Sequence, residues 1–343
     1  MSYKIERAAV LGAGTMGAAI AAHLANAGIP SLLLDVVPSE LTEEEKRQGL
    51  DLDHPQVRNR IVCQGWQRCL KARPANLFSE RLAGLVEFGN LEDDFERLGD
   101  ADWIIEAVVE RLEVKIPLME RIEAVRKTGS LVSTNTSGLP VRGLTEGRSP
   151  DFKSHFLGTH FFNPPRYLKL LELIPGEETA TELVSFMQNF AETRLGKGVV
   201  LCKDTPNFIA NRFFSIAGTY TLNYALEHGY SIEEVDALTG PLIGYPKSAT
   251  FRMLDLVGVD VMAHVGGNLY PAIEGDAWRE VLRHPRSQAM VEGLVQRGWL
   301  GNKSGQGFYK RVDGEGGKAF WSLDPGTFEY RAPGAPRFDS VGK

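Results

Sequence analysis

The sequence predicts an α/β protein with a doubly wound, mostly parallel sheet, a helical-hairpin insertion and an all-helical second domain. Two observations predict this class. Short apolar, strand-like runs alternate with helical patterns up to about residue 203, and a glycine-rich turn joins the first run to the first helix. From residue 204 onward the patterns are helical only. We therefore expect domains at 1–203 and 204–310, with an extended tail or linker at 311–343.

The composition excludes several classes of function. The chain has 343 residues, enough for two domains, and its 43% hydrophobic and 24% charged content is typical of a soluble protein. A net charge of −6 provides no basic surface for nucleic acid, and no apolar run is long enough to span a membrane. The three cysteines match no zinc-site spacing, and no signal-peptide pattern precedes the first strand. We expect a cytoplasmic enzyme without a metal ion.

The first strand, helix and second strand form a βαβ pattern over residues 7–36, with the turn GAGTMG at 12–17. In such a GxGxxG turn the first glycine allows the tight bend, and the second lets the backbone approach a pyrophosphate. The third permits close helix packing, and the helix N-terminus faces the phosphates. The predicted nucleotide contacts are Gly12, Gly14, Thr15, Met16 and Gly17. A turn that binds no nucleotide is the alternative, and the surrounding βαβ pattern disfavours it.

Asp35 ends the second strand, 21 residues after Gly14. A carboxylate at this position accepts hydrogen bonds from the adenosine ribose hydroxyls and repels a 2′-phosphate. The sequence therefore predicts NAD rather than NADP.

The alternation of strand and helix lapses between about residues 39 and 84, where charged helical segments predict an inserted helical hairpin. Its basic residues include Lys46, Arg47, Arg58, Arg60, Arg68, Lys71 and Arg73. A charge run is usually a solvated face. The functional alternative is a cationic wall for a phosphorylated substrate.

Polar residues follow the next buried strands. Glu110 comes after the run DWIIEAV, and Asn135 and Ser137 come at the end of LVSTN and just beyond it. Because ligands bind outside the carboxyl ends of strands in an open parallel sheet, these residues are candidates for the site. Glu110 and Ser137 are equally consistent with simple helix caps.

The stretch LGTHFFNPPRYLKLLELI at residues 157–174 joins two apolar runs through a proline turn. If the runs pair antiparallel with the reversal near Arg166, His160 and Glu172 become direct cross-strand partners, about 5 Å apart at Cβ. A carboxylate among leucines is costly to bury without a partner, and histidine is a partner that also moves protons. A structural His–Glu pair in the core is the alternative.

The second domain begins with a predicted long helix, capped by Thr205 with Pro206 as its first residue. Ser231 and Glu234 form the capping box of the next helix. A glycine-rich loop, LGNKSGQGFYKR, carries Lys303, and the Gly-, Pro- and Asp-rich tail beyond it has little periodicity.

These motifs together resemble the L-3-hydroxyacyl-CoA dehydrogenases of fatty-acid β-oxidation. The resemblance runs from about residue 7 to 310 and has six elements in order: VLGAGTMGAAIA, IIEAVVERLEVK, STNTSGL, GTHFFNPPRYLKLLELI, TPNFIANR and NKSGQGFY. It implies a Rossmann-type first domain, NAD as cofactor, an acyl-CoA thioester as substrate and a homodimer formed through the helical half. It also implies that the helical hairpin holds coenzyme A.

The resemblance also implies roles for matching residues. His160 corresponds to the catalytic base and Glu172 to the residue that orients it, while Ser137 and Asn211 hold the substrate near its 3-oxygen. The implied cofactor contacts in the remaining motifs are Val109, Glu110, Lys115, Asn135, Ser137, Asn163 and Lys303. The chemistry agrees, because oxidation of a secondary alcohol needs a base near pH 7 while hydride leaves for the nicotinamide.

Two features depart from the family pattern. The tail beyond residue 310 predicts a connector into a further module, which we expect to be an enoyl-CoA hydratase. Ser248, Ala249 and Thr250 stand where a plainer glycine-containing motif is common. Two alternative functions stay open: a dehydrogenase of a small free 3-hydroxy acid, which would rely on a lysine, and a catalytically idle NAD-binding protein.

Overall fold

The computed structural model describes residues 3–314, 317–332, 334 and 336–338. The chain divides into two compact units, residues 1–208 and 209–343. The sequence-predicted boundary at 203 lies slightly before the observed one. Residues 204–208 stay with the first unit because the carboxylate of Asp204 accepts hydrogen bonds from the backbone of Val141 and Arg142, and Phe208 is buried in that unit's core.

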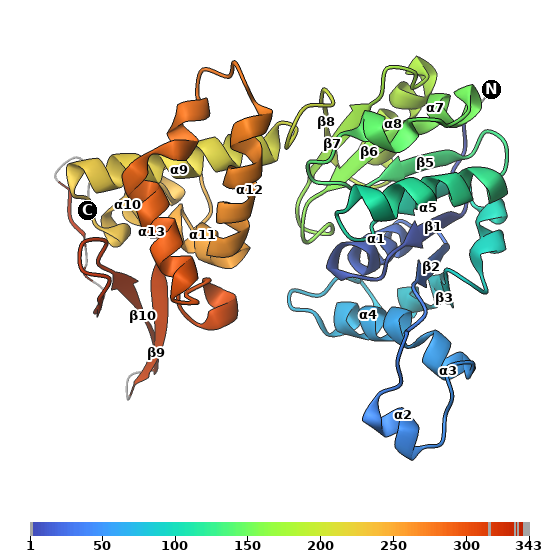
Figure 1. Ribbon diagram of the computed structural model, residues 1–343, viewed down its shortest axis with the longest axis horizontal. Helices are drawn as coiled ribbons and strands as arrows, with labels where there is room; N and C mark the ends of the chain where they lie inside the picture. The colour runs from blue at the N-terminus through green and yellow to red at the C-terminus, as the bar shows by residue number, and fades with distance from the viewer. Residues whose placement is uncertain (1–2, 315–316, 333, 335, 339–343) are drawn as a thin grey trace. The chain divides into compact units, whose positions relative to one another are not determined.

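The first unit is built on an eight-stranded sheet of order β3-β2-β1-β4-β5-β6-β7-β8 (Figure 1). The strands are β1 Ala8–Leu11, β2 Ser31–Asp35, β3 Val86–Asn90, β4 Trp103–Glu106, β5 Leu131–Thr134, β6 Phe156–Phe161, β7 Leu170–Pro175 and β8 Gly198–Leu201. Strands β1 to β6 pair in parallel with one another, whereas β7 is antiparallel to β6. The strand order reverses between β1 and β4, which is where a doubly wound sheet binds its ligand.

Helices cover both faces of this sheet. They are α1 Thr15–Asn26, α2 Glu43–Arg47, α3 Pro55–Arg58, α4 Arg60–Lys71, α5 Leu112–Val125, α6 Val141–Thr145, α7 Pro150–Ser154 and α8 Thr181–Thr193, with short 3₁₀ segments η1 Glu80–Leu85 and η2 Phe95–Asp100. Apolar residues of α1, α4 and α8 pack on one face. Those of η2, α5, α6 and α7 pack on the other. The central strands are buried on both faces, which explains their continuous apolar runs.

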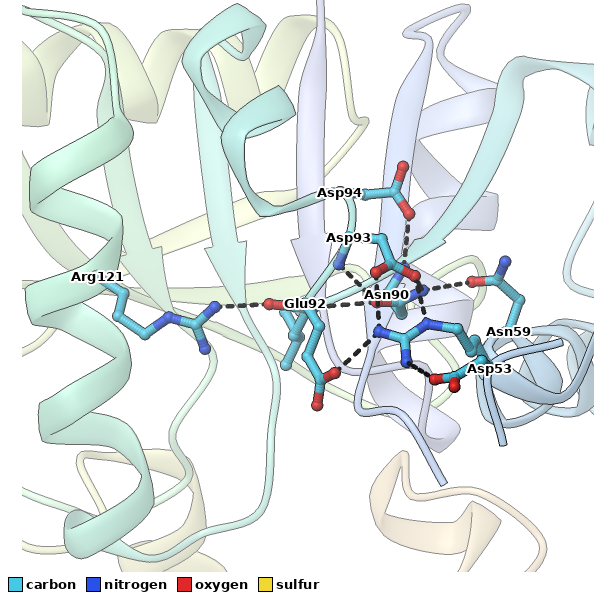
Figure 2. Close-up of polar contacts among 9 residues, drawn as sticks. Asp53, Asn59, Asn90, Glu92, Asp93, Asp94 and Arg121 are labelled. Atoms are coloured by element: carbon cyan, nitrogen blue, oxygen red, sulfur yellow. Dashed lines mark hydrogen bonds and ion pairs between the residues drawn. The ribbon is translucent and has the colours of Figure 1, made fainter. Parts of the chain in front are cut away.

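The predicted insertion between β2 and β3 contains α2, α3, α4 and η1. Its middle part, at the end of α3, is joined to the turn after β3 by polar side chains (Figure 2). The Asn90 side chain accepts hydrogen bonds from the backbone N–H groups of Glu92 and Asp93 and donates one to Asn59. Arg58 forms ion pairs with Glu92 and Asp93. The insertion is therefore anchored to the edge of the sheet beside β2.

The second unit is mainly helical. Its elements up to the last helix are α9 Ala210–His228, α10 Ile232–Leu238, η3 Pro241–Ile243, α11 Phe251–Val257, α12 Val259–Ala272, η4 Arg279–Arg283, α13 Pro285–Gln296 and η5 Asn302–Ser304. The predicted capping box of α10 is confirmed, since Ser231 accepts from the backbone of Glu234 and the Glu234 carboxylate accepts from that of Ser231. Among the helices of the described residues, none combines the length and apolarity that a membrane crossing requires.

Residues assigned by sequence to the tail form part of this unit. Strands β9 Tyr309–Gly314, β10 Gly317–Leu323 and β11 Tyr330–Arg331 make an antiparallel sheet. Phe308 and Leu323 are buried in the core formed by α9, α10, α11 and α13. The prediction of an extended tail or linker from residue 311 was therefore wrong for these strands, because buried apolar positions are interspersed among residues that indicate turns.

The start of α9 also differs from the prediction. Thr205 and Pro206 do not begin the helix, because Asn207 and Phe208 have positive φ angles of 58° and 48° and separate them from its first residue, Ala210. Phe208 is buried in the first unit. Burial of this ring outweighs the local capping signal.

Candidate active site

The glycine turn GAGTMG has the geometry of a nucleotide-binding loop. Gly12 has a φ of +100°, and a Cβ on it would lie 2.5 Å from the carbonyl oxygen of Ala107, which follows β4. A Cβ on Gly17 would lie 1.8 Å from the Gly12 oxygen, so only glycine lets α1 approach the turn. A Cβ on Gly14 would have no neighbour within 4 Å. The turn is therefore closed towards the protein at Gly12 and Gly17 and open at Gly14, as binding of a pyrophosphate requires.

Helix α1 begins at Thr15 with no side-chain hydrogen bond from its N-cap, Gly14. The N–H groups of its first turn, including those of Thr15, Met16 and Gly17, face the loop and suit phosphate oxygens. Asp35 lies beside the loop at the end of β2, and its carboxylate accepts a hydrogen bond of 2.6 Å from the backbone of Ala13. The residues present therefore fit a dinucleotide.

His160 and Glu172 are the cross-strand pair that the sequence predicts. They are register partners on β6 and β7. Nδ1 of His160 lies 2.7 Å from a carboxylate oxygen of Glu172. The residues are 4% and 1% exposed. The ring centroids of Phe162 and Phe208 lie 4.3 Å and 5.9 Å from the centroid of the imidazole. A neutral imidazole that donates from Nδ1 to the carboxylate carries its basic lone pair on Nε2.

A second polar network lies at the carboxyl ends of β4 and β5. One oxygen of Glu110 accepts hydrogen bonds from the Thr136 hydroxyl, at 2.6 Å, and from the backbone of Ser137, at 2.7 Å. Its other oxygen lies 3.2 Å from Nζ of Lys115. Glu110 thus fixes the backbone at Ser137, whose side chain is exposed. The helix-cap interpretation of Glu110 and Ser137 does not describe these contacts.

Glu106 is a central member of this network that sequence reasoning missed. It is fully buried at the end of β4, and one of its oxygens accepts a 2.6 Å hydrogen bond from Lys115, which is 1% exposed. The same oxygen accepts from the backbone of Val108, and the second accepts from the Thr134 hydroxyl at 2.6 Å. The available signal was a single carboxylate inside the apolar run DWIIEAV, because buried charges are rarely unpaired.

The Asn135 side chain contacts the backbone of β6. Its side-chain oxygen accepts a 2.9 Å hydrogen bond from the backbone of Phe161, the residue after His160. Its own N–H donates to the Glu106 carbonyl. Asn135 therefore connects β4, β5 and the end of β6 that carries His160. Val109 and Asn163, also predicted to contact the cofactor, are exposed at this same edge of the sheet, after β4 and β6 respectively.

Two predicted residues belong to the second unit. Asn211 is half-buried in the first turn of α9. Lys303 donates a 2.6 Å hydrogen bond to the Asp260 carboxylate. The loop that carries Lys303 is held by Asp255, whose carboxylate accepts from the backbone of Phe308 and Tyr309, each at 2.8 Å. Burial raises the pKa of Asp255 to about 6. The roles of Asn211 and Lys303 at the site stay predictions.

Comparison with known proteins decides the family. The model of the 3-hydroxyacyl-CoA dehydrogenase NAD-binding domain matches residues 7–205, and that of the C-terminal domain matches residues 208–311. The chain belongs to the 3-hydroxyacyl-CoA dehydrogenase family. The resemblance, the predicted Rossmann-type fold and NAD as the cofactor are thereby confirmed.

Three relatives illustrate the family membership. A probable 3-hydroxyacyl-CoA dehydrogenase of Bacillus subtilis is 54% identical over 96% of this chain and 41% of its own length. A probable 3-hydroxyacyl-CoA dehydrogenase of Deinococcus radiodurans is 46% identical over 91% of this chain and 84% of its own. The crystal structure of 3-hydroxybutyryl-CoA dehydrogenase from Escherichia coli is 30% identical, with a TM-score of 0.64 over 90% of this chain and 60% of that one. The chain thus spans about two fifths of the Bacillus relative.

Proposed function

We propose that the chain catalyses the reversible NAD-dependent oxidation of (S)-3-hydroxyacyl-CoA to 3-oxoacyl-CoA in fatty-acid β-oxidation. The observation that carries the proposal is the 2.7 Å contact between His160 and Glu172, buried beside the edge of the sheet where the glycine turn lies. The names of the relatives from Bacillus subtilis and Deinococcus radiodurans support the same substrate class.

In this mechanism His160 is the general base. Glu172 accepts the hydrogen bond from Nδ1, so Nε2 takes the proton from the 3-hydroxyl group. The carboxylate then stabilises the imidazolium that forms. NAD, which the glycine turn and Asp35 would hold, would supply the acceptor for the hydride that leaves C3. The rings of Phe162 and Phe208 shield the imidazole from water, and in the reverse direction Nε2–H returns the proton to the 3-oxo group.

Ser137 and Asn211 are proposed to hold the 3-oxygen of the substrate. Hydrogen-bond donors fixed before the reaction stabilise developing charge without reorganisation. Glu110 supplies that fixation for Ser137 through the 2.7 Å contact with its backbone. Asn163 is proposed to lie beside the nicotinamide. The other proposed cofactor contacts beyond the glycine turn and Asp35 are Val109, Glu110, Lys115, Asn135, Ser137 and Lys303.

Replacement of Asp35 tests the proposed contact with the adenosine ribose. Asp35→Arg removes the charge that repels a 2′-phosphate and adds one that attracts it, so the ratio of kcat/KM for NADPH over NADH should rise at least about tenfold. Asp35→Asn is the matched control, because it retains an acceptor for Ala13 and adds no cation. Steady-state kinetics with both coenzymes measure the ratio, and an unchanged ratio in Asp35→Arg would refute the assignment.

NADH consumption with acetoacetyl-CoA, compared with free acetoacetate, tests the proposed reaction. The proposal predicts turnover of the thioester and little turnover of the free acid. Preferential turnover of acetoacetate would support the free-acid dehydrogenase instead, although that alternative relies on a lysine and the His160–Glu172 pair disfavours it. Turnover of neither compound would support an idle NAD-binding protein.

We also infer the oligomeric state of the protein, its location in the cell and the presence of a further module. Exposed Phe213, Phe214 and Tyr220 on α9 support a homodimer formed through the helical unit. Cys63, Cys69 and Cys202 form no disulfide within the described part of the chain, which supports a reducing, cytoplasmic location. The length of the Bacillus subtilis relative is compatible with fusion to a further module, which we propose to be an enoyl-CoA hydratase.

A further inference from the structure

The loop of residues 162–169 joins β6 to β7 and carries Asn163. Lys197, which is 5% exposed, supports it from within the protein: its Nζ donates hydrogen bonds to the carbonyl oxygens of Pro165 and of Leu168, the latter at 2.9 Å. The ammonium also lies 5.5 Å from the centroid of the Phe161 ring. Burial lowers the pKa of Lys197 to about 8. A buried lysine is thus used to hold backbone carbonyls next to the catalytic strands.

Arg166 fixes the same loop to the inserted hairpin. Its NH1 group donates to the carbonyl oxygens of Ala75 and Leu77, at 2.6 Å and 2.7 Å. The guanidinium carbon lies 4.4 Å from the Phe78 ring centroid and 5.1 Å from that of Tyr167. Within the described part of the chain, Arg166 forms no ion pair with a carboxylate. Its contacts with the hairpin are therefore two backbone carbonyls and one aromatic ring of the short segment 75–78.

The segment that Arg166 contacts is itself fixed to the rest of the insertion and to α1. The Asn76 side chain donates to the Cys69 carbonyl in α4, at 3.1 Å. Asn26 in α1 donates to the Asn76 carbonyl and accepts from the backbone of Phe78, each at 2.8 Å. In α4, a Cβ on Gly65 would lie 2.1 Å from the carbonyl oxygen of Ala13. Helix α4 thus contacts the glycine turn and is joined, through the segment 75–78 and Arg166, to the β6–β7 loop.

The end of α4 nearest this segment is positively charged. Among the basic residues of the insertion, Lys46, Arg47, Arg58 and Arg60 form ion pairs with carboxylates. Arg68, Lys71 and Arg73 are exposed, and no ion pair involves them among the residues that the structure describes. Three such cations suit a polyanion and are compatible with the phosphate groups of coenzyme A. A solvated helix end would explain the charges alone but not the contacts of Arg166.

We propose that Arg166 is a positioning residue that couples the inserted hairpin to the loop carrying Asn163. Binding of the nucleotide part of coenzyme A to the hairpin then sets this loop, and the His160–Glu172 strands that it joins, for hydride transfer. The proposal rests on the proposed function for its substrate. It explains how binding energy from a remote part of the substrate is expressed in the chemical step.

The test compares Arg166→Ala with the unmodified chain on two substrates. One is acetoacetyl-CoA, and the other is acetoacetyl-N-acetylcysteamine, which has the thioester but no nucleotide. With acetoacetyl-CoA, Arg166→Ala should lower kcat by about 10–100-fold, the loss typical of a small misplacement of reacting groups. With the truncated thioester the two proteins should have kcat values within about twofold, because no nucleotide is present to use the coupling.

Two further variants separate positioning from folding. Tyr167→Phe removes only the hydroxyl that donates to Ala75 at 3.0 Å and should change kcat little. Arg166→Lys preserves one donor and the charge and should recover part of the kcat with acetoacetyl-CoA; it also provides the comparison if Arg166→Ala does not fold. The proposal would be overturned if kcat fell equally on both substrates, if only KM rose, or if Arg166→Ala did not lower kcat for acetoacetyl-CoA. Failure of the proposed function is distinct, since the unmodified chain would then not turn over acetoacetyl-CoA.

Discussion

His160→Gln is expected to lower kcat for acetoacetyl-CoA reduction by about 10²–10⁴-fold, the usual contribution of general acid–base catalysis. Glutamine approximates the size of the imidazole and retains a donor for Glu172, but it neither takes nor gives a proton near pH 7. The affinity for NADH should change little, because the glycine turn and Asp35 lie on other strands. Steady-state kinetics and NADH fluorescence titration measure the two quantities.

The matched control for this variant is His155→Gln. His155 lies immediately before β6, at the opposite end of the strand from His160, and its Nδ1 contacts Ser154 and the backbone of Asp151. Its replacement should leave kcat within about twofold, as for a substitution outside the site. A kcat for His160→Gln equal to that of the unmodified chain would remove His160 from the mechanism.

Glu106→Gln should lower the free energy of unfolding by about 3 kcal/mol, because it leaves the buried Lys115 ammonium without its closest counter-charge. Glu110, whose side chain is 42% exposed and lies 3.2 Å from the ammonium, compensates only in part. The double variant Glu106→Gln/Lys115→Met should be more stable than Glu106→Gln alone, since it removes the uncompensated charge as well. Urea unfolding followed by circular dichroism measures each free energy.

An exposed ion pair provides the comparison for Glu106. Glu113 pairs with Arg111 at the start of α5, and both side chains are more than half exposed. Glu113→Gln should therefore leave the free energy of unfolding nearly unchanged. If Glu106→Gln were no more destabilising than Glu113→Gln, the buried pair would not stabilise this part of the site.

The features that depend on local periodicity could be predicted from sequence. The turn at residues 12–17 is set by glycine positions within one βαβ unit. The pairing of His160 with Glu172 follows from two apolar runs and the proline turn between them, because a two-residue period and a fixed reversal determine the register. Both features need information from fewer than about thirty consecutive residues.

Features that depend on distant segments could not be predicted. Lys115 and Glu106 are nine residues apart, but their contact depends on how α5 returns to the sheet. Arg166 is 91 residues from Ala75 in sequence, and the target of its hydrogen bond is a backbone carbonyl, which no residue pattern identifies. At Thr205 the capping pattern was present, but the tertiary burial of Phe208 decided where the helix begins.

The most direct measurement of the central claim is a crystal structure of the chain with NAD and acetoacetyl-CoA bound. We expect Nε2 of His160 to lie within about 2.6–3.2 Å of the 3-oxo oxygen, with the Glu172 carboxylate still hydrogen-bonded to Nδ1 and the acyl chain beside the nicotinamide. An imidazole directed away from the bound acyl group, or a 3-oxo oxygen held by another acid–base residue, would contradict it.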